Sequence, residues 1–154
     1  MSGLDAIDVK VERPTGLTTG NTFPLLHEIR HALERLASTG EPTTIDLSSI
    51  PFAPEDRAQL LDILGKGEVE ARLDAFGPSN IRETAYPGVW LVQHMSPQGE
   101  EHSSLIEITR FPSLLQTPEA DVTDSAAALA DRLAASGREG SGLNTEHRPA
   151  LKQE

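Results

Sequence analysis

Two histidines and a glutamate stand at a spacing that many zinc enzymes use. His27, Glu28 and His31 form the pattern H-E-x-x-H. On a helix, residues four apart lie one turn apart on the same face, so both imidazoles can hold one zinc ion while the glutamate activates water. The pattern therefore makes a small zinc-dependent hydrolase one alternative for this chain.

The apolar residues around this pattern place the histidines on the opposite side of the predicted helix. Ile29 is the centre of an apolar stripe. When each residue advances ~100°, three leucines lie within about 40° of it: Leu25, Leu33 and Leu36. His27 and His31 fall about 160° away from Ile29, which favours a solvent-exposed face.

A catalytic zinc ion also needs a third protein ligand and a sheltered site. The extended zinc-protease pattern requires glycine and histidine at the positions where Glu34 and Ala37 stand. A distant third ligand, such as Glu55 or Asp56, stays open. We therefore predict no metal site, with His27 and His31 as the alternative metal ligands.

Composition narrows the classes of function. The 154 residues include no cysteine, and 24 acidic against 13 basic residues give a net charge of −11. The absence of thiolates excludes cysteine catalysis and a cluster held by the chain's own cysteines. The negative charge disfavours nucleic acid and favours basic partner segments. With no secretory signal and no long apolar run, we expect a cytoplasmic protein that has no cofactor and does not insert into a membrane.

Hydrophobic periodicity and turn residues predict an α+β domain. Helices are expected between Thr22 and Gly40 and from Pro54 to Leu64, and strands at residues 43–47, 69–75, 81–86, 89–95 and 105–111. Short connections favour antiparallel neighbours. We predict a mixed or mainly antiparallel sheet of about four to five strands, packed with two helices, plus a C-terminal helix.

The composition changes along the chain suggest four parts. Residues 1–19 are predicted to form a strand and loop, residues 20–117 the domain, residues 118–136 an appended helix that Gly137 ends, and residues 137–154 a flexible polar tail.

Several segments of this domain resemble a known family. Residues 67–71, 81–90 and 105–112, with the helix at 25–36 and its stop at 40–42, resemble the C-terminal-type domain of the HupH/HyaF family of NiFe-hydrogenase expression and formation proteins. The resemblance covers about residues 20–117. Its most specific part is the pattern E-T-x-x-P-G-V-W, which begins at Glu83 and ends at Trp90.

The resemblance implies an accessory role in hydrogenase maturation and no catalytic residues. The resemblance implies a chaperone or scaffold. This protein is expected to bind the iron–sulfur small subunit, a thioredoxin-like hydrogenase accessory protein, or both, before the small subunit is exported. Longer members of the family carry two related domains where this chain has room for one, so two copies are expected to associate as a homodimer. A generic acidic protein-interaction module remains a further alternative.

Six residues are the candidate partner contacts: Glu83, Thr84, Pro87, Gly88, Trp90 and His94. Pro87 and Gly88 are predicted to form a turn before the Trp90 strand. Two roles stay open for Trp90, which are partner contact and burial in the core against the first helix. Two roles also stay open for Glu83, which are partner contact and a structural ion pair with Arg110 or Arg72.

Overall fold

The structure is a computed structural model that describes residues 18–75 and 77–140. The chain divides into two units, Met1–Pro112 and Ser113–Glu154, which are described separately. The strand predicted within residues 1–17 and the tail beyond residue 140 lie outside the described residues.

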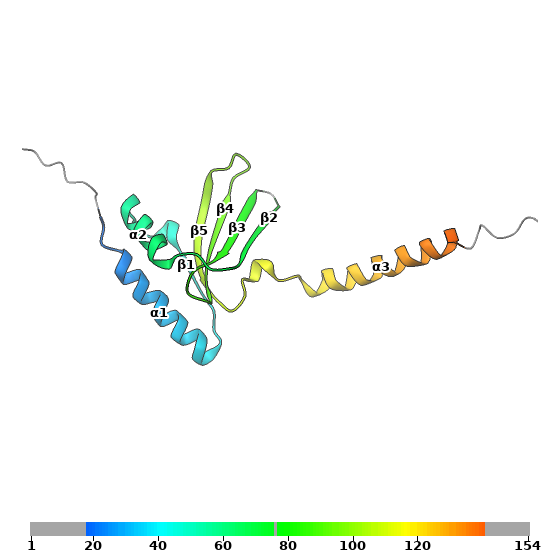
Figure 1. Cartoon of the computed structure of the whole chain (residues 1–154), viewed down its shortest axis with the longest axis horizontal. Coiled ribbons are helices and arrows are strands. Elements are labelled where there is room, and N and C mark those ends of the chain that lie inside the picture. The colour runs from blue at the N-terminus through cyan, green and yellow to red at the C-terminus, as the bar shows by residue number, and fades with distance from the viewer. Residues whose placement is uncertain (1–17, 76, 141–154) are drawn as a thin grey trace, which may run out of the picture. The chain divides into compact units, whose positions relative to one another are not determined.

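The first unit contains one five-stranded sheet with the strand order β1-β5-β4-β3-β2, and every neighbouring pair is antiparallel (Figure 1). The strands are β1 (Thr43–Asp46), β2 (Glu70–Asp74), β3 (Pro78–Glu83), β4 (Val89–Met95) and β5 (Glu101–Ile108). The helices are α1 (Thr22–Thr39), the short η1 (Leu47–Ser49) and α2 (Pro54–Leu64). The predicted α+β class is confirmed.

Helix α1 forms because its apolar residues make one stripe and because glycine ends it. Gly40 adopts a φ of 79° and donates its backbone N–H to the Leu36 carbonyl at 2.9 Å. This left-handed conformation costs glycine little and satisfies a carbonyl of the last turn. The buried stripe of α1 then packs with α2 and one face of the sheet.

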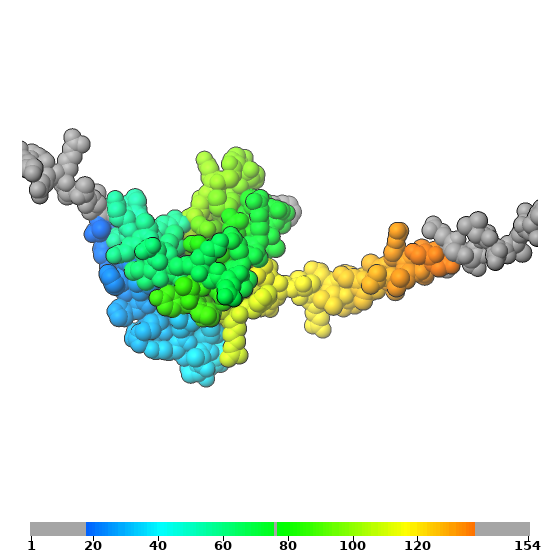
Figure 2. Space-filling model, in the orientation of Figure 1, coloured from blue at the N-terminus to red at the C-terminus, as the bar shows by residue number. Residues whose placement is uncertain are grey.

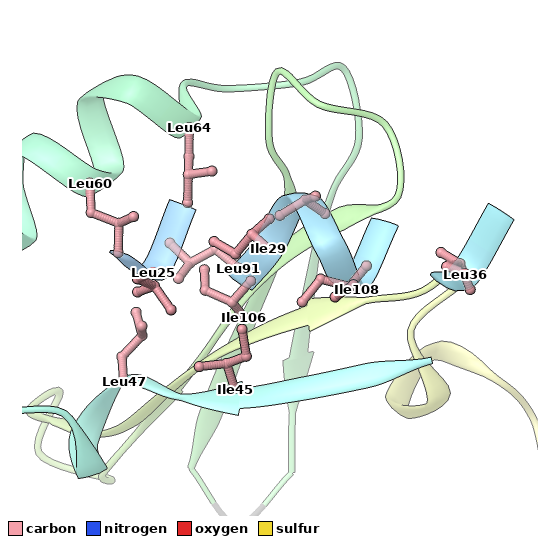
Figure 3. Close-up of a cluster of buried hydrophobic side chains, with 12 residues drawn as sticks. Leu25, Ile29, Leu36, Ile45, Leu47, Leu60, Leu64, Leu91, Ile106 and Ile108 are labelled. Carbon is pink, nitrogen blue, oxygen red and sulfur yellow. The ribbon is translucent and has the colours of Figure 1, made fainter. Parts of the chain in front are cut away.

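The core lies between these two helices and that sheet face (Figure 3). The members of this core on β4 (Val89 and Leu91) and on β5 (Ile106 and Ile108) alternate along each strand, as expected for one face of a pleated sheet. The cluster contains twelve residues: Leu25, Ile29, Ala32, Leu36, Ile45, Leu47, Leu60, Leu64, Val89, Leu91, Ile106 and Ile108.

Two strands begin earlier than the apolar pattern predicts. β3 begins at Pro78, which pairs with Asp74, so Pro78 and Ser79 belong to the strand and not to the turn before it. Proline is tolerated there because the first residue of a strand can lack an N–H donor. β4 has the predicted bounds.

β5 begins at Glu101 and not at Leu105, because the β4–β5 hairpin closes beyond the core. Ser96 donates its N–H to the Glu100 carbonyl at 2.7 Å. Residues 97–102 are exposed, so this part of the hairpin carries polar side chains and no apolar alternation. The tip of the hairpin stands clear of α1 and α2 in the space-filling view (Figure 2).

The second unit contains the short η2 (Ser113–Leu115) and the 22-residue helix α3 (Glu119–Gly140). The helix continues through Gly137, the residue at which the sequence predicts its end. Gly137 lacks the positive φ through which a glycine commonly ends a helix. No helix within the described ranges is long and apolar enough to cross a membrane.

Candidate functional site

The H-E-x-x-H segment lies on the exposed face of α1. His27 and His31 are both exposed, while Ile29 is buried, as the periodicity predicts. Arg30 Nη2 lies 2.8 Å from His31 Nε2, and the Arg30 guanidinium also pairs with Glu34 at 2.6 Å. The histidines therefore form part of a polar, solvent-facing surface.

Neither open candidate for a third zinc ligand joins this pair. Asp56 is buried at the start of α2, where its carboxylate accepts the Thr19 N–H at 2.5 Å and the Thr19 hydroxyl at 2.6 Å. These hydrogen bonds lower the pKa of Asp56 below its ordinary value of 3.8. Across residues 18–75 and 77–140, no three histidine, aspartate or glutamate side chains are grouped as a metal site.

Four of the six candidate contacts lie together at one bend of the chain, residues Glu83 to Gly88, which we name the Tyr86 corner. The Val89 N–H donates to the Tyr86 carbonyl at 3.0 Å, and Gly88 has a φ of 89°. Proline followed by glycine suits the two central positions of such a turn. The predicted turn at Pro87 and Gly88 is therefore confirmed.

The buried residue of this corner holds its backbone in place. Thr84 is 2% exposed, and its hydroxyl oxygen accepts the Tyr86 N–H at 3.2 Å. The Thr84 N–H donates to the Val89 carbonyl at 2.9 Å. Thr84 thus closes the loop from within, and its side chain is not available to a partner.

The segment that follows α2 supports the corner from one side. The Ala85 N–H donates to the Leu64 carbonyl at 2.8 Å, and the Gly67 N–H donates to the Glu83 carbonyl at 2.9 Å. A β-carbon on Gly67 would lie 2.5 Å from the Thr84 carbonyl oxygen, so only glycine permits this approach without a shift. The corner is therefore a fixed element.

The outer surface of the corner separates two open hollows. One, of about 380 Å³, is lined by Leu33, Leu36, Ala37, Glu83, Pro87, Gly88 and Arg110. The other, of about 460 Å³, is lined by Lys66, Gly67, Glu68, Glu83, Thr84, Ala85 and Pro87. Glu83 and Pro87 line both hollows, and the neighbouring Tyr86 side chain is 47% exposed.

The predicted structural ion pair of Glu83 does not form. Arg72 pairs instead with Asp74 at 3.0 Å. Among the described residues, no salt bridge joins Glu83 to Arg110, although both line the 380 Å³ hollow. A carboxylate and a guanidinium therefore face this hollow with their ion-pairing capacity unused.

Trp90 is buried, but not against α1. The residue is 4% exposed, and its indole donates Nε1–H to the Thr109 carbonyl at 3.0 Å. Val89 and Leu91 belong to the core cluster under the helices, so the alternation of β4 places Trp90 on the other face of the sheet. The prediction that Trp90 packs against the first helix is wrong. Burial was expected correctly, but the face of the sheet on which Trp90 lies depends on strand register.

On that face the cross-strand neighbours of Trp90 are Glu83 and Glu107. Burial raises the pKa of Glu107, and the nearby charge of His94 partly opposes this rise. Trp90 thus separates two carboxylates, and its own surface is too small to serve as a contact residue.

His94 lies away from the corner, toward the other end of β4. Its Nδ1 is 2.8 Å from the Ser79 hydroxyl oxygen. It lines a third hollow, of about 340 Å³, together with Met95 and His102. His94 lies four steps along β4 from Trp90, about 13 Å, so the structure does not bring His94 together with the corner.

The residues of the candidate surface that lie outside the six predicted contacts include Tyr86, Arg110 and Leu33. Tyr86 occupies a variable position of the pattern E-T-x-x-P-G-V-W. Tyr86 is the first residue of the turn and is exposed together with its neighbours Ala85 and Pro87. An aromatic residue directly before Pro-Gly was the available signal. Arg110 and Leu33 are far from the corner in sequence, and only the fold brings them to it.

Comparison with known proteins identifies the family. Residues 19–136 match the family described as HupH hydrogenase expression protein, C-terminal conserved region. The chain is 35% identical over 120 residues to the hydrogenase expression/formation protein HoxQ of Azotobacter vinelandii, covering 77% of this chain and 42% of that protein. It is 32% identical over 130 residues to HupH of Rhizobium leguminosarum bv. viciae, covering 84% and 45%.

A solved structure shares the fold. The hydrogenase expression protein HupH from Thiobacillus denitrificans superposes with a TM-score of 0.73 and 44% identity, covering 76% of this chain and 98% of that one. The chain spans less than half the length of these two curated relatives. By this match to their C-terminal conserved region, the chain belongs to the family of HupH hydrogenase expression proteins.

Proposed function

We propose that this chain is a non-enzymatic accessory protein of NiFe-hydrogenase maturation that acts in the cytoplasm. In this role it binds the iron–sulfur small subunit, or another maturation factor such as a thioredoxin-like accessory protein, before export. The relatives are named as hydrogenase expression or formation proteins, which supports a role in hydrogenase maturation. The Tyr86 corner is the surface that we assign to the contact.

The observation that carries this assignment is a fixed bend with an exposed aromatic side chain at its tip. Tyrosine supplies a large contact area with few rotatable bonds, and it is common among the residues that dominate binding energy. The backbone around Tyr86 is already held by Thr84, Leu64 and Gly67. Binding therefore requires little further ordering of the chain, which lowers its entropic cost.

The hollow beside the tip adds charge to an apolar surface. Leu33, Leu36 and Pro87 supply apolar area, while Glu83 and Arg110 supply opposite charges that no salt bridge joins. Two charges held apart at one hollow fit a polypeptide segment that carries both an acidic and a basic group. This arrangement supports protein binding and not the chemistry of an active site.

The test measures capture of purified hydrogenase small-subunit precursor, and separately of the thioredoxin-like accessory protein, by immobilised chain. Tyr86→Ala is expected to weaken binding of one bait at least tenfold, as loss of a central aromatic contact typically does. Phe23→Ala is the matched control, because Phe23 is an exposed aromatic of α1 (59%) away from the corner. Equal binding by wild type, Tyr86→Ala and Phe23→Ala would contradict the assigned surface.

Glu83→Gln tests the charge of the hollow separately from the fold. Glutamine keeps the size of the side chain and removes its charge. We expect unchanged unfolding, since no ion pair is lost, and binding of the bait weakened about threefold to tenfold. If the Glu83→Gln chain unfolds more easily than wild type but binds the bait normally, the role of Glu83 is structural.

A further inference from the structure

Helix α3 carries an apolar stripe that is exposed along its length. Val122, Leu129 and Leu133 are 56%, 61% and 65% exposed, and Ala126 completes the stripe between them. Their spacing of four, three and four residues places all four within about 60° of Leu129 on a helix of 3.6 residues per turn. The stripe extends ~16 Å along the axis.

Such a stripe is typical of a helix that packs against another helix. A single helix in water gains little stability from propensity alone, and most helices in proteins are stabilised by packing of an apolar face. The same four-three spacing is the one that lets two helices interlock their side chains. The small residues Ala126 and Ser125 near the stripe permit close approach of another helix.

The charges beside the stripe decide what that partner is. Asp121 and Arg132 flank the stripe on the same side, about 60–80° from Leu129, near opposite ends of the helix. Glu119 flanks it on the other side, again in the first turn. The helix therefore offers acid near its start and a base near its end along one edge.

We propose that α3 pairs with α3 of a second copy of this chain in antiparallel orientation. Aligning the two stripes at their midpoints places Val122 opposite the second copy's Leu133, and Ala126 opposite its Leu129. In this arrangement equivalent flanks of the two helices meet. Arg132 of each copy then lies within reach of Asp121 of the other, and the ion pair occurs twice.

A parallel pair lacks this complementarity. It would bring the two acidic first turns together, with Glu119 and Asp121 of both copies at one end, and it would align the two helix dipoles. Antiparallel pairing sets the dipoles in opposition and separates the acidic ends. The partner is thus a second copy in one orientation, and the pairing does not depend on the Tyr86 corner.

The first experiment measures the mass of the full chain in solution at concentrations of about 10 to 500 µM, the range suited to a small interface. We expect a reversible dimer. Leu129→Asp, which puts a charge into the centre of the stripe, is expected to weaken it at least 100-fold. Ala134→Asp is the matched control, because Ala134 lies about 140° from Leu129 and is expected to leave the mass unchanged.

A monomer at every concentration, or equal loss with Ala134→Asp, would overturn the proposal. Circular dichroism accompanies both variants. A Leu129→Asp chain that is monomeric while its first unit remains folded supports the proposal, because the loss of the dimer is then due to α3 and not to unfolding.

A charge-exchange series tests the orientation. Arg132→Glu alone is expected to weaken the dimer about fivefold or more, because it turns two attractive contacts into repulsive ones. Adding Asp121→Arg to the same chain restores both pairs, so the double variant is expected to dimerise within about twofold of wild type. A double variant as weak as Arg132→Glu alone would exclude the antiparallel alignment.

Discussion

The buried carboxylate of Asp56 connects helix α2 to the segment that precedes helix α1. It belongs to the first turn of α2, yet its hydrogen bonds are to Thr19, before the start of α1. The Thr22 hydroxyl donates to the Asp56 backbone carbonyl at 3.1 Å, which adds a second connection. An ionised carboxylate suits this place, because it only accepts hydrogen bonds and lies near a helix N-terminus.

Asp56 is therefore expected to make stability depend on acidity. Its pKa is lowered by the Thr19 donors below 3.8, so its stabilising contribution is complete above that pH and is lost as the pH falls through the folded-state pKa. Asp56→Asn should lower the urea midpoint of unfolding at pH 7, and the difference from wild type should narrow near about pH 2.5. Asp62→Asn, an exposed aspartate of the same helix, is the control. A constant difference at both pH values would contradict this role.

Trp90 is expected to be a stability residue. Removing its side chain should cost about 3–5 kcal/mol, since it is buried, while Trp90→Phe should cost less because only the bond to the Thr109 carbonyl and part of the packing are lost. Urea unfolding followed by circular dichroism measures both. A Trp90→Ala chain that unfolds like wild type and loses bait binding would instead make Trp90 a contact residue.

Sequence alone could place residues on helix faces better than on sheet faces. The exposure of His27 and His31 follows from a period that a single helix fixes by itself. The face of Trp90 depends on register with β3 and β5, and the unpaired state of Glu83 depends on where Arg72 and Arg110 lie after folding. These facts arise from long-range pairing, which local spacing does not contain.

At the scale of elements, the segment between α2 and β2 decides the position of the Tyr86 corner. Gly67 lies so close to Thr84 that any side chain there must displace the backbone of the corner. Gly65 nearly contacts Ala85, with a built β-carbon 3.0 Å from the Ala85 β-carbon. Two glycines two residues apart therefore permit the chain to pass close against the turn.

Gly67→Ala is expected to destabilise the chain by about 1–3 kcal/mol, the usual cost of overpacking, and to weaken bait binding by moving the corner. Gly137→Ala is the matched control, and it is expected to stabilise its helix instead of destabilising the chain. Apart from its two chain neighbours and the nearby backbone of its own helix, no described atom lies within 4 Å of a β-carbon placed on Gly137, and alanine favours helix by up to about 1 kcal/mol. Urea denaturation measures the stability of both variants, and circular dichroism measures their helix content. An unchanged Gly67→Ala chain would show that the corner adapts.

The element boundaries show the same limit of local information. β4 was predictable to the residue because it begins with four apolar residues and follows a Pro-Gly turn. The start of β5 was not, because Glu101 to Ser103 extend the hairpin beyond the helices and carry no burial pattern. The predicted helix end at Gly137 was wrong because this glycine does not adopt the positive φ through which a glycine commonly ends a helix.

At the scale of the whole molecule, the charge of −11 acts on encounter more than on the bound state. The hollow beside the Tyr86 corner is lined by both Glu83 and Arg110, so the charges at this surface do not follow the net charge. Long-range attraction and short-range fit are therefore separable properties of this chain.

Kinetics can separate them. If the bait carries a basic segment, raising salt should lower the association rate, because screening shortens the range of attraction, and should change the dissociation rate little. Tyr86→Ala should do the opposite, raising the dissociation rate while leaving the association rate within about a factor of three. Surface plasmon resonance at several ionic strengths measures both rates for both chains. An association rate that is insensitive to salt would mean that the acidic surface does not guide the partner, and binding would then depend on the corner alone.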